Sequence, residues 1–153
     1  MRHMKTNKKG FTLIELLVVV AIIGLLSTLA VVALSSARKK ANDSKRLSDM
    51  KQIQTALELY YTDNNLYPVQ ALPANLGQGN YLCLDSDGFD ATCAIDPYMG
   101  LIPTGPGTTE YYIYTSADGS TYTVTSELEV GSGNFGLGDV TASPSGIIGQ
   151  PKT

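Results

Sequence analysis

The sequence predicts an α+β fold, in which one long N-terminal helix packs on a small antiparallel β-sheet head. Three patterns lead to this prediction. Residues 11–34 form an unbroken apolar run, residues 35–62 continue with an amphipathic helical pattern, and residues 110–130 alternate between apolar and polar side chains. The chain has 153 residues and a formal charge of -3, which fits a single domain of ordinary size.

Residues 1–10 form a short basic leader that has no apolar core of its own. A conventional secretory signal is cut after its apolar region, whereas here the apolar run follows the leader. Loss of Arg2, Lys5, Lys8 and Lys9 with the leader would take the formal charge from -3 to -7. Such an acidic mature chain is a poor candidate for nonspecific nucleic-acid binding.

Residues 11–34 are predicted to cross a membrane. Glu15 is the only charged residue in this run. At 1.5 Å per residue, a helix of this length is about 36 Å long, which is enough to cross the hydrocarbon core of a bilayer. We expect these residues to be the transmembrane and assembly half of a stem helix.

Glu15 is the candidate functional residue of this run. An ionised acid at the centre of a membrane helix costs about 2.5–3.5 kcal/mol, and such residues commonly serve a function. No basic residue lies between Phe11 and Arg38 to neutralise it. A cut between Gly10 and Phe11 would create a new amino group. The positive charge of this amino group and the negative charge of Glu15 would attract by about 4 kcal/mol if they lay about 4 Å apart at an effective dielectric of 20, before desolvation is counted.

The segment from Lys8 to Leu17, which reads KKGFTLIELL, resembles the N-terminal motif of the type IV pilins and the type II secretion pseudopilins. The resemblance implies that a prepilin peptidase cuts after Gly10 and methylates the new amino group of Phe11. It also implies that Glu15 pairs with the terminal amine of a neighbouring subunit as a filament grows.

The same resemblance implies the pilin fold and a set of partners. The subunit would be a homo-oligomer in a helical filament. Before assembly it would cross the cytoplasmic membrane once, with its head outside, and afterwards it would lie in a cell-surface pilus or a periplasmic pseudopilus. A prepilin peptidase, an assembly platform protein and an ATPase are the other implied partners. Two alternatives stay open: a pseudopilin of a type II secretion system, and a minor pilin that acts as an adhesion or DNA-binding module.

Residues 35–62 are predicted to be the amphipathic half of the stem helix. The apolar stripe consists of Ala37, Ala41, Leu47, Met50, Ile53, Leu57 and Tyr60. The side chains expected to face water are those of Lys45, Asp49, Lys51, Gln52 and Glu58. We expect the helix to end at about Thr62, because Asn64, Asn65 and Pro68 follow. The basic residues between Arg38 and Lys51 could contact anionic lipid headgroups or acidic patches on neighbouring subunits, or simply face water.

Residues 63–153 are predicted to form a loop-rich globular head. Outside the cytoplasm we expect a disulfide between Cys83 and Cys93, and in a reducing host two free thiols. Asp85, Asp87 and Asp90 are weak candidates for a calcium site, because alternating carboxylates beside a glycine can bind Ca²⁺. Their spacing does not match the EF-hand loop, so an acidic surface turn is the main expectation and no metal is predicted.

Residues 110–130 carry the clearest β pattern and predict a hairpin with a turn at residues 117–120. The side chains expected on its core face are those of Tyr112, Tyr114, Tyr122, Val124, Leu128 and Val130. Ligand binding by stacking is the alternative use of the tyrosines. Residues 131–153 are rich in glycine and serine and are expected to be a flexible tail. The tail lacks the acidic calcium segment that major secretion pseudopilins carry.

No enzyme is predicted. The single histidine, His3, lies in the leader, and the sequence has no nucleophile and base pattern, phosphate loop or metal-ligand cluster. No cofactor is expected either. The sequence therefore predicts a structural protein that is processed at Gly10 and Phe11.

Overall fold

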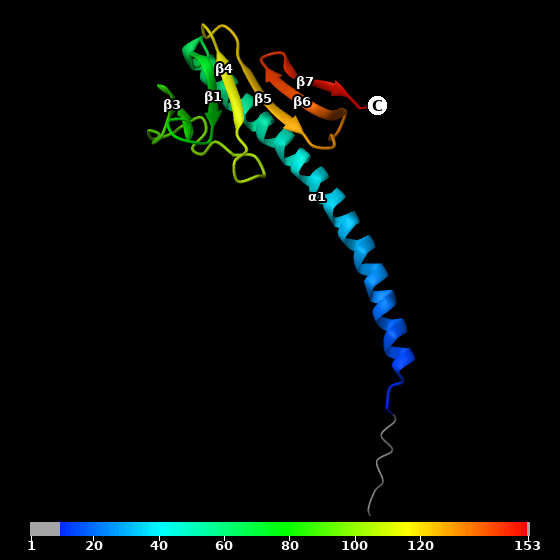
Figure 1. Cartoon of the computed structure of the whole chain (residues 1–153). Coiled ribbons are helices and arrows are strands. Elements are labelled where there is room, and N and C mark those ends of the chain that lie inside the picture. Colours follow the sequence, from blue (N-terminus) through cyan, green and yellow to red (C-terminus); the bar gives the residue numbers. More distant parts are fainter. Residues whose placement is uncertain (1–9, 153) are drawn as a thin grey trace, which may run out of the picture. The chain divides into compact units, whose positions relative to one another are not determined.

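The computed structural model describes residues 10–152. Most of the predicted leader, including His3, lies outside these residues. Figure 1 shows the elements, which are α1 (Leu13–Asn64), β1 (Gln70–Leu76), β2 (Cys83–Asp85), β3 (Gly88–Asp90), β4 (Tyr112–Ser116), β5 (Thr123–Leu128), β6 (Phe135–Ser143) and β7 (Gly146–Pro151). The chain divides into two compact units, and the boundary falls between Ala37 and Arg38.

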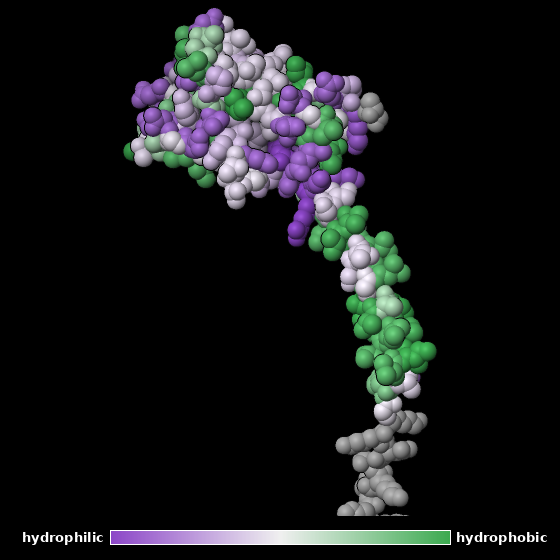
Figure 2. Space-filling model, viewed as in Figure 1, coloured by the Kyte–Doolittle hydropathy of each residue, from purple (hydrophilic) through white to green (hydrophobic). Residues whose placement is uncertain are grey.

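The first unit contains the apolar part of α1. This helix is long and apolar enough to cross a membrane, and none of its apolar window is buried. Every side chain from Leu13 to Ala37 is exposed. Figure 2 shows this segment as mostly hydrophobic, with a few paler residues between the hydrophobic ones. Such a surface fits a membrane anchor or a helix that packs against other apolar helices, because a large exposed apolar patch is rare on a soluble monomer.

The second unit is the head, which begins with the second half of α1. A five-stranded antiparallel sheet, with the strand order β1-β4-β5-β6-β7, packs on this part of the helix, and β2 and β3 form a separate hairpin. Met50, Ile53 and Leu57 of α1 are at most 2% exposed and share one core with the sheet. The predicted α+β fold, with a long helix on an antiparallel sheet, is therefore confirmed.

The predicted hairpin at residues 110–130 is also confirmed. Strands β4 and β5 pair in antiparallel register, with Tyr114 opposite Val124. Tyr112, Tyr114 and Tyr122 are at most 1% exposed, and each hydroxyl donates a hydrogen bond within the head. These tyrosines are core residues, so the alternative of ligand stacking does not apply to them. Val130, expected on the same face, lies beyond the end of β5 and is 38% exposed.

The end of α1 lies two residues beyond the predicted Thr62. Asn65 adopts a left-handed conformation with φ of 57°, and its N–H donates to the carbonyl of Tyr61 at 2.8 Å. Asparagine tolerates this conformation better than most residues, and it is a common way for a helix to stop. Pro68 then directs the chain into β1.

The prediction of a flexible tail at residues 131–153 is wrong, because this segment contains β6 and β7. Val140 and Ala142 of β6 are fully buried against α1 and β5. The glycines that suggested flexibility permit close packing. A Cβ on Gly149 would come within 2.7 Å of the Val140 side chain, and one on Gly136 within 3.0 Å of the Pro151 carbonyl oxygen.

Candidate functional site

The predicted processing site lies just before α1. Gly10 and Phe11 are exposed and precede the first helical residue, Leu13. Phe11 has 88% of its surface accessible. The bond between Gly10 and Phe11 therefore lies outside the helix.

Glu15 makes local contacts that the sequence prediction missed. Its Oε2 accepts hydrogen bonds from the Thr12 backbone N–H at 2.8 Å and from the Thr12 hydroxyl at 2.7 Å. The Glu15 N–H donates to the Thr12 hydroxyl oxygen at 3.3 Å. This reciprocal pair is a capping box, which satisfies free N–H groups at the start of a helix. The signal was present in the sequence as threonine followed three residues later by glutamate.

No cation partners Glu15 within residues 10–152, where the ion pairs all lie in the head. The capping box therefore provides hydrogen bonds to the carboxylate but does not neutralise its charge. A positive group for Glu15 has to come from outside the described chain or from a change at its N-terminus.

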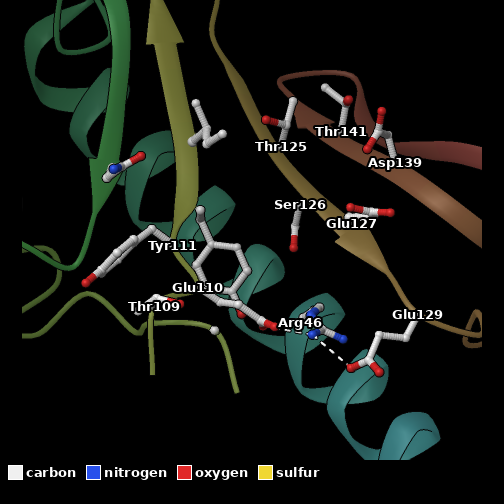
Figure 3. A pocket seen from close by; sticks show the side chains of 14 residues that line it. Arg46, Thr109, Glu110, Tyr111, Thr125, Ser126, Glu127, Glu129, Asp139 and Thr141 are labelled. Atoms are coloured by element: carbon white, nitrogen blue, oxygen red, sulfur yellow. Dashed lines mark hydrogen bonds and ion pairs between the residues drawn. The ribbon is translucent and has the colours of Figure 1, made fainter. Parts of the chain in front are cut away.

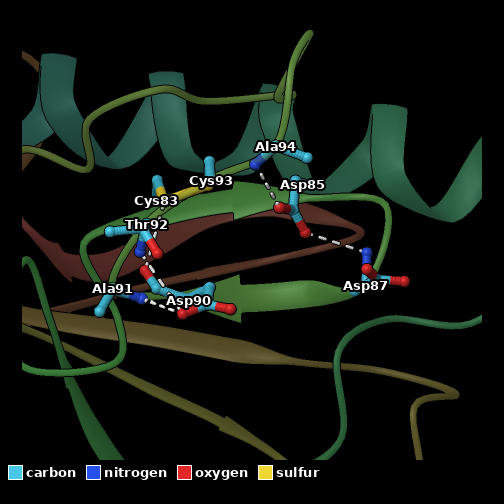
Figure 4. Close-up of a disulfide and its surroundings, with 8 residues drawn as sticks. All are labelled: Cys83, Asp85, Asp87, Asp90, Ala91, Thr92, Cys93 and Ala94. Atoms are coloured by element: carbon cyan, nitrogen blue, oxygen red, sulfur yellow. Dashed lines mark hydrogen bonds between the residues drawn. A yellow bond between two sulfur atoms is a disulfide. The ribbon is translucent and has the colours of Figure 1, made fainter.

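The acidic loop does not form a metal site in the structure. Asp85 is 5% exposed, and its two oxygens accept hydrogen bonds from the backbone N–H groups of Asp87 and Ala94, each at 3.0 Å (Figure 4). Asp90 accepts from the N–H of Ala91. Within residues 10–152, no three acidic, histidine or cysteine side chains are grouped to hold a metal ion. Asp85 thus organises the loop backbone from a buried position, whereas an exposed turn was expected.

The expected disulfide between Cys83 and Cys93 is present. It joins β2 to the segment after β3, as Figure 4 shows, and Cys83 is 3% exposed. The bond closes a loop around the β2 and β3 hairpin, which contributes few residues to the core. Such a small element depends on local links of this kind.

Removal of the disulfide should destabilise the head by about 2–3 kcal/mol, because the bridge restricts the unfolded chain. The test replaces Cys83 and Cys93 together by serine and compares urea midpoints with the wild-type protein. A reducing agent should lower the midpoint of the wild type and leave that of the double variant unchanged. Equal midpoints for the disulfide-bonded wild type and the double variant, both without reducing agent, would contradict a stabilising role.

A buried ion network lies where α1 enters the head, and it was not predicted. Asp43 is fully buried, and its carboxylate accepts hydrogen bonds from the N–H groups of Glu129, Val130 and Gly131 at 2.8–2.9 Å. Arg46 donates to Asp43 at 2.7 Å. The network fixes the segment that follows β5 onto the helix.

Arg46 also binds two acids on the sheet side. Its Nη2 donates to Glu110 at 2.8 Å and to Glu129 at 3.1 Å (Figure 3). Asp49, expected to face water, is 6% exposed and accepts a hydrogen bond from Tyr112 at 2.7 Å. The basic stretch from Arg38 to Lys51 is therefore not one solvated face, because Arg46 points into the head.

Hydrogen bonding controls the pKa of Asp43. Burial by itself raises the pKa of this carboxyl, but the three backbone N–H groups and the Arg46 guanidinium outweigh burial and hold the pKa below its usual range. The unfolded chain, in which the pKa is ordinary, then binds more protons than the folded chain at low pH. The contribution of Asp43 to stability is thus present above about pH 4 and is lost as pH falls through its lower folded pKa.

As the pH falls below about 4, the free energy of unfolding of the head should therefore decrease more steeply in the wild type than in Asp43→Asn, which has no carboxyl to titrate. Near-ultraviolet circular dichroism of the buried tyrosines reports the unfolding. Parallel pH profiles for the two proteins would show that Asp43 does not cause the dependence.

An open groove of about 760 Å³ lies over the solvent face of the sheet beside this network (Figure 3). Glu127 and Asp139 line it and stand directly opposite each other on β5 and β6. Its other lining side chains include Ile113 and the hydroxyls of Thr125 and Thr141. The lining residues include no histidine, cysteine or lysine.

Comparison with known proteins gives a consistent set of relatives. Residues 5–31 match the family model described as the prokaryotic N-terminal methylation motif. The type II secretion system core protein G of Klebsiella michiganensis is 34% identical over 104 residues, which are 63% of this chain and 72% of that protein. Core protein G of Aeromonas hydrophila is 42% identical over 64 residues, which are 42% of this chain and 45% of that protein.

The type IV wide pilus major component PilA4 of Thermus thermophilus is 46% identical over 61 residues, which are 40% of this chain and 47% of that protein. The matched part of this chain thus spans less than half the length of several of the relatives. No solved structure matches the chain significantly.

Proposed function

This chain belongs to the family of the type IV pilins and type II secretion pseudopilins, and we propose that it is a structural subunit of a type IV pilus or pilus-like filament. The observation that carries this proposal is the exposed apolar half of α1, which has no partner within residues 10–152 and carries a single acid near its start. Burial among identical helices would give this surface a partner in every subunit.

We infer that a prepilin peptidase cuts between Gly10 and Phe11 and that the new amino group of Phe11 is methylated. The family motif and the exposed, non-helical position of the bond support this step. The cut also creates the cation that Glu15 lacks. In the filament, we propose that the Glu15 carboxylate pairs with the terminal amine of a neighbouring subunit.

The ion pair would add direction to the packing of the helices. Transfer of an apolar helix from lipid to a bundle of apolar helices exposes nothing to water, so hydrophobicity alone does not fix the register between neighbours. Two opposite charges about 4 Å apart in a partly apolar site attract by about 4 kcal/mol, less the cost of desolvation. Glu15 is therefore proposed to set the register.

We propose that, before assembly, the subunit lies in the cytoplasmic membrane as a single-pass protein with its head outside. The apolar segment of α1 supports the anchor, and the disulfide supports an oxidising location for the head. Assembly then requires a platform protein and an ATPase, as in the rest of the family. The filament would extend from the cell surface or remain a short pseudopilus in the periplasm.

The pseudopilin of a type II secretion system is the second candidate, because the relatives include several core G proteins of that system. The two functions predict different defects in a cell that lacks this subunit. A pilus subunit supports surface filaments, whereas a pseudopilin supports the export of folded proteins. The third possibility is a minor pilin that acts as an adhesion or DNA-binding module, and the acidic head disfavours its DNA-binding form.

The test is co-expression of the full chain with a prepilin peptidase and the assembly proteins of a related system, followed by electron microscopy of sheared material. We expect filaments that contain this subunit and that disappear when the peptidase is omitted. If the chain instead restored protein export in cells that lack their own pseudopilin, without surface filaments, the result would favour the pseudopilin. Neither filaments nor export, from a chain that is inserted and folded, would contradict the proposed function.

A further inference from the structure

We propose that Arg38, Lys39 and Lys40, here called the basic collar, bind the anionic headgroups of membrane lipids. The collar differs from the other cations of α1. Lys45, Arg46 and Lys51 all donate hydrogen bonds to side chains of the head. All three collar residues are exposed and make no ion pair or side-chain hydrogen bond within residues 10–152.

The position of the collar along the sequence matches the depth of the headgroups. The apolar run ends at Leu34, and α1 continues as a helix through the collar. At 1.5 Å per residue, the collar begins about 6 Å and ends about 9 Å beyond Leu34. The headgroup layer on each side of a bilayer is about 5–7 Å thick. Long lysine and arginine side chains can bend back to reach it.

The arrangement of the three charges favours a lipid surface over a single anion. Successive residues of a helix are about 100° apart, so three in a row spread over more than half of its circumference. They cannot converge on one phosphate ion, and an acidic patch on a neighbouring protein would approach from one side only. A layer of anionic headgroups surrounds the helix and can meet all three charges.

The charge of the rest of the head fits the same interpretation. Between residues 41 and 152, thirteen carboxylates stand against four lysine or arginine side chains. An anionic membrane surface would repel this acidic head and attract the collar. Figure 2 shows the change from apolar to strongly hydrophilic residues along this part of α1. The collar therefore gives the unassembled subunit a specific contact with phosphatidylglycerol or another anionic lipid.

The test uses the full chain in phosphatidylcholine vesicles that contain trace amounts of spin-labelled phosphatidylglycerol or phosphatidylcholine. Electron paramagnetic resonance measures how strongly each labelled lipid associates with the protein. The wild type is compared with Arg38→Gln/Lys39→Gln/Lys40→Gln and with a control, Lys51→Gln/Lys152→Gln. Residues 1–10 are identical in all three proteins, so any contribution of the leader cancels.

We expect loss of the collar to reduce the preference for phosphatidylglycerol by at least about fivefold, because one such contact provides about that factor and the variant removes three. The control should keep the wild-type preference, and millimolar inorganic phosphate at constant ionic strength should not abolish it. An unchanged preference in the collar variant would overturn the proposal. If that variant also failed to form filaments, the collar would instead bind a neighbouring subunit. If the control variant also failed to form filaments, the loss of filaments could not be assigned to the collar. It would then bear on the proposed function of the chain as a filament subunit, and the lipid preference alone would decide the collar proposal.

Discussion

Replacement of Glu15 by alanine should reduce filament formation by at least tenfold while the chain is still inserted and cut. The variant loses the only charged side chain of the apolar run and therefore the proposed ion pair with the terminal amine of the next subunit. A net loss of about 1.4 kcal/mol per contact suffices for a tenfold effect, well below the gross attraction of about 4 kcal/mol. Insertion should not suffer, because removal of an acid makes the helix more apolar.

The capping box allows the charge of Glu15 to be separated from its local role. Glu15→Gln keeps an oxygen that can accept from the Thr12 N–H and hydroxyl, but it carries no charge. Thr12→Ala keeps the charge and removes half of the box, at a cost of about 1 kcal/mol in helix stability. We expect the glutamine variant to assemble as poorly as the alanine variant. Normal filaments from Glu15→Gln, measured by the yield of sheared subunit, would show that the ion pair is not required.

Replacement of Asp43 by alanine should destabilise the head by about 3–5 kcal/mol, which is the usual cost of breaking a buried ion pair from one side. Three backbone N–H groups lose their acceptor, and Arg46 keeps only its two partly exposed partners, Glu110 and Glu129. In a head of this size the melting temperature should fall by roughly 10 °C or more.

Asp139→Ala is the matched control, because Asp139 is exposed on the neighbouring strand and makes no ion pair within the described residues. Its melting temperature should stay within a few degrees of the wild type. Thermal unfolding followed by near-ultraviolet circular dichroism measures both. Similar small shifts for the two variants would mean that the network around Asp43 does not hold the head together.

The regular spacing of apolar residues along the sequence made the main elements predictable. The apolar run and the stripe through Met50, Ile53 and Leu57 predicted a helix to within two residues of its end. The alternation of Tyr112, Tyr114 and Val124 likewise predicted the hairpin and its buried face. Both patterns are repeated many times, so no single residue decides the outcome.

Features that depend on distant contacts were not predictable in the same way. Asp43 and Arg46 look like ordinary solvated residues of a helix. Only the fold brings the N–H groups after β5 to Asp43, to which Arg46 also donates. The glycine-rich composition of the tail predicted flexibility. In the structure, Gly136 and Gly149 instead lie at close backbone and side-chain contacts within the sheet. The capping box of Thr12 and Glu15 could have been found from its spacing alone.

The most direct test of the central claim is the intact mass and N-terminal sequence of the subunit, purified from filaments or from membranes of cells that contain a prepilin peptidase. We expect a chain that starts at Phe11, carries one added methyl group and is two hydrogen atoms lighter than the reduced form. This result would establish entry into the filament pathway. A chain that still starts at Met1 would reduce the motif to an uncleaved membrane anchor and contradict the account.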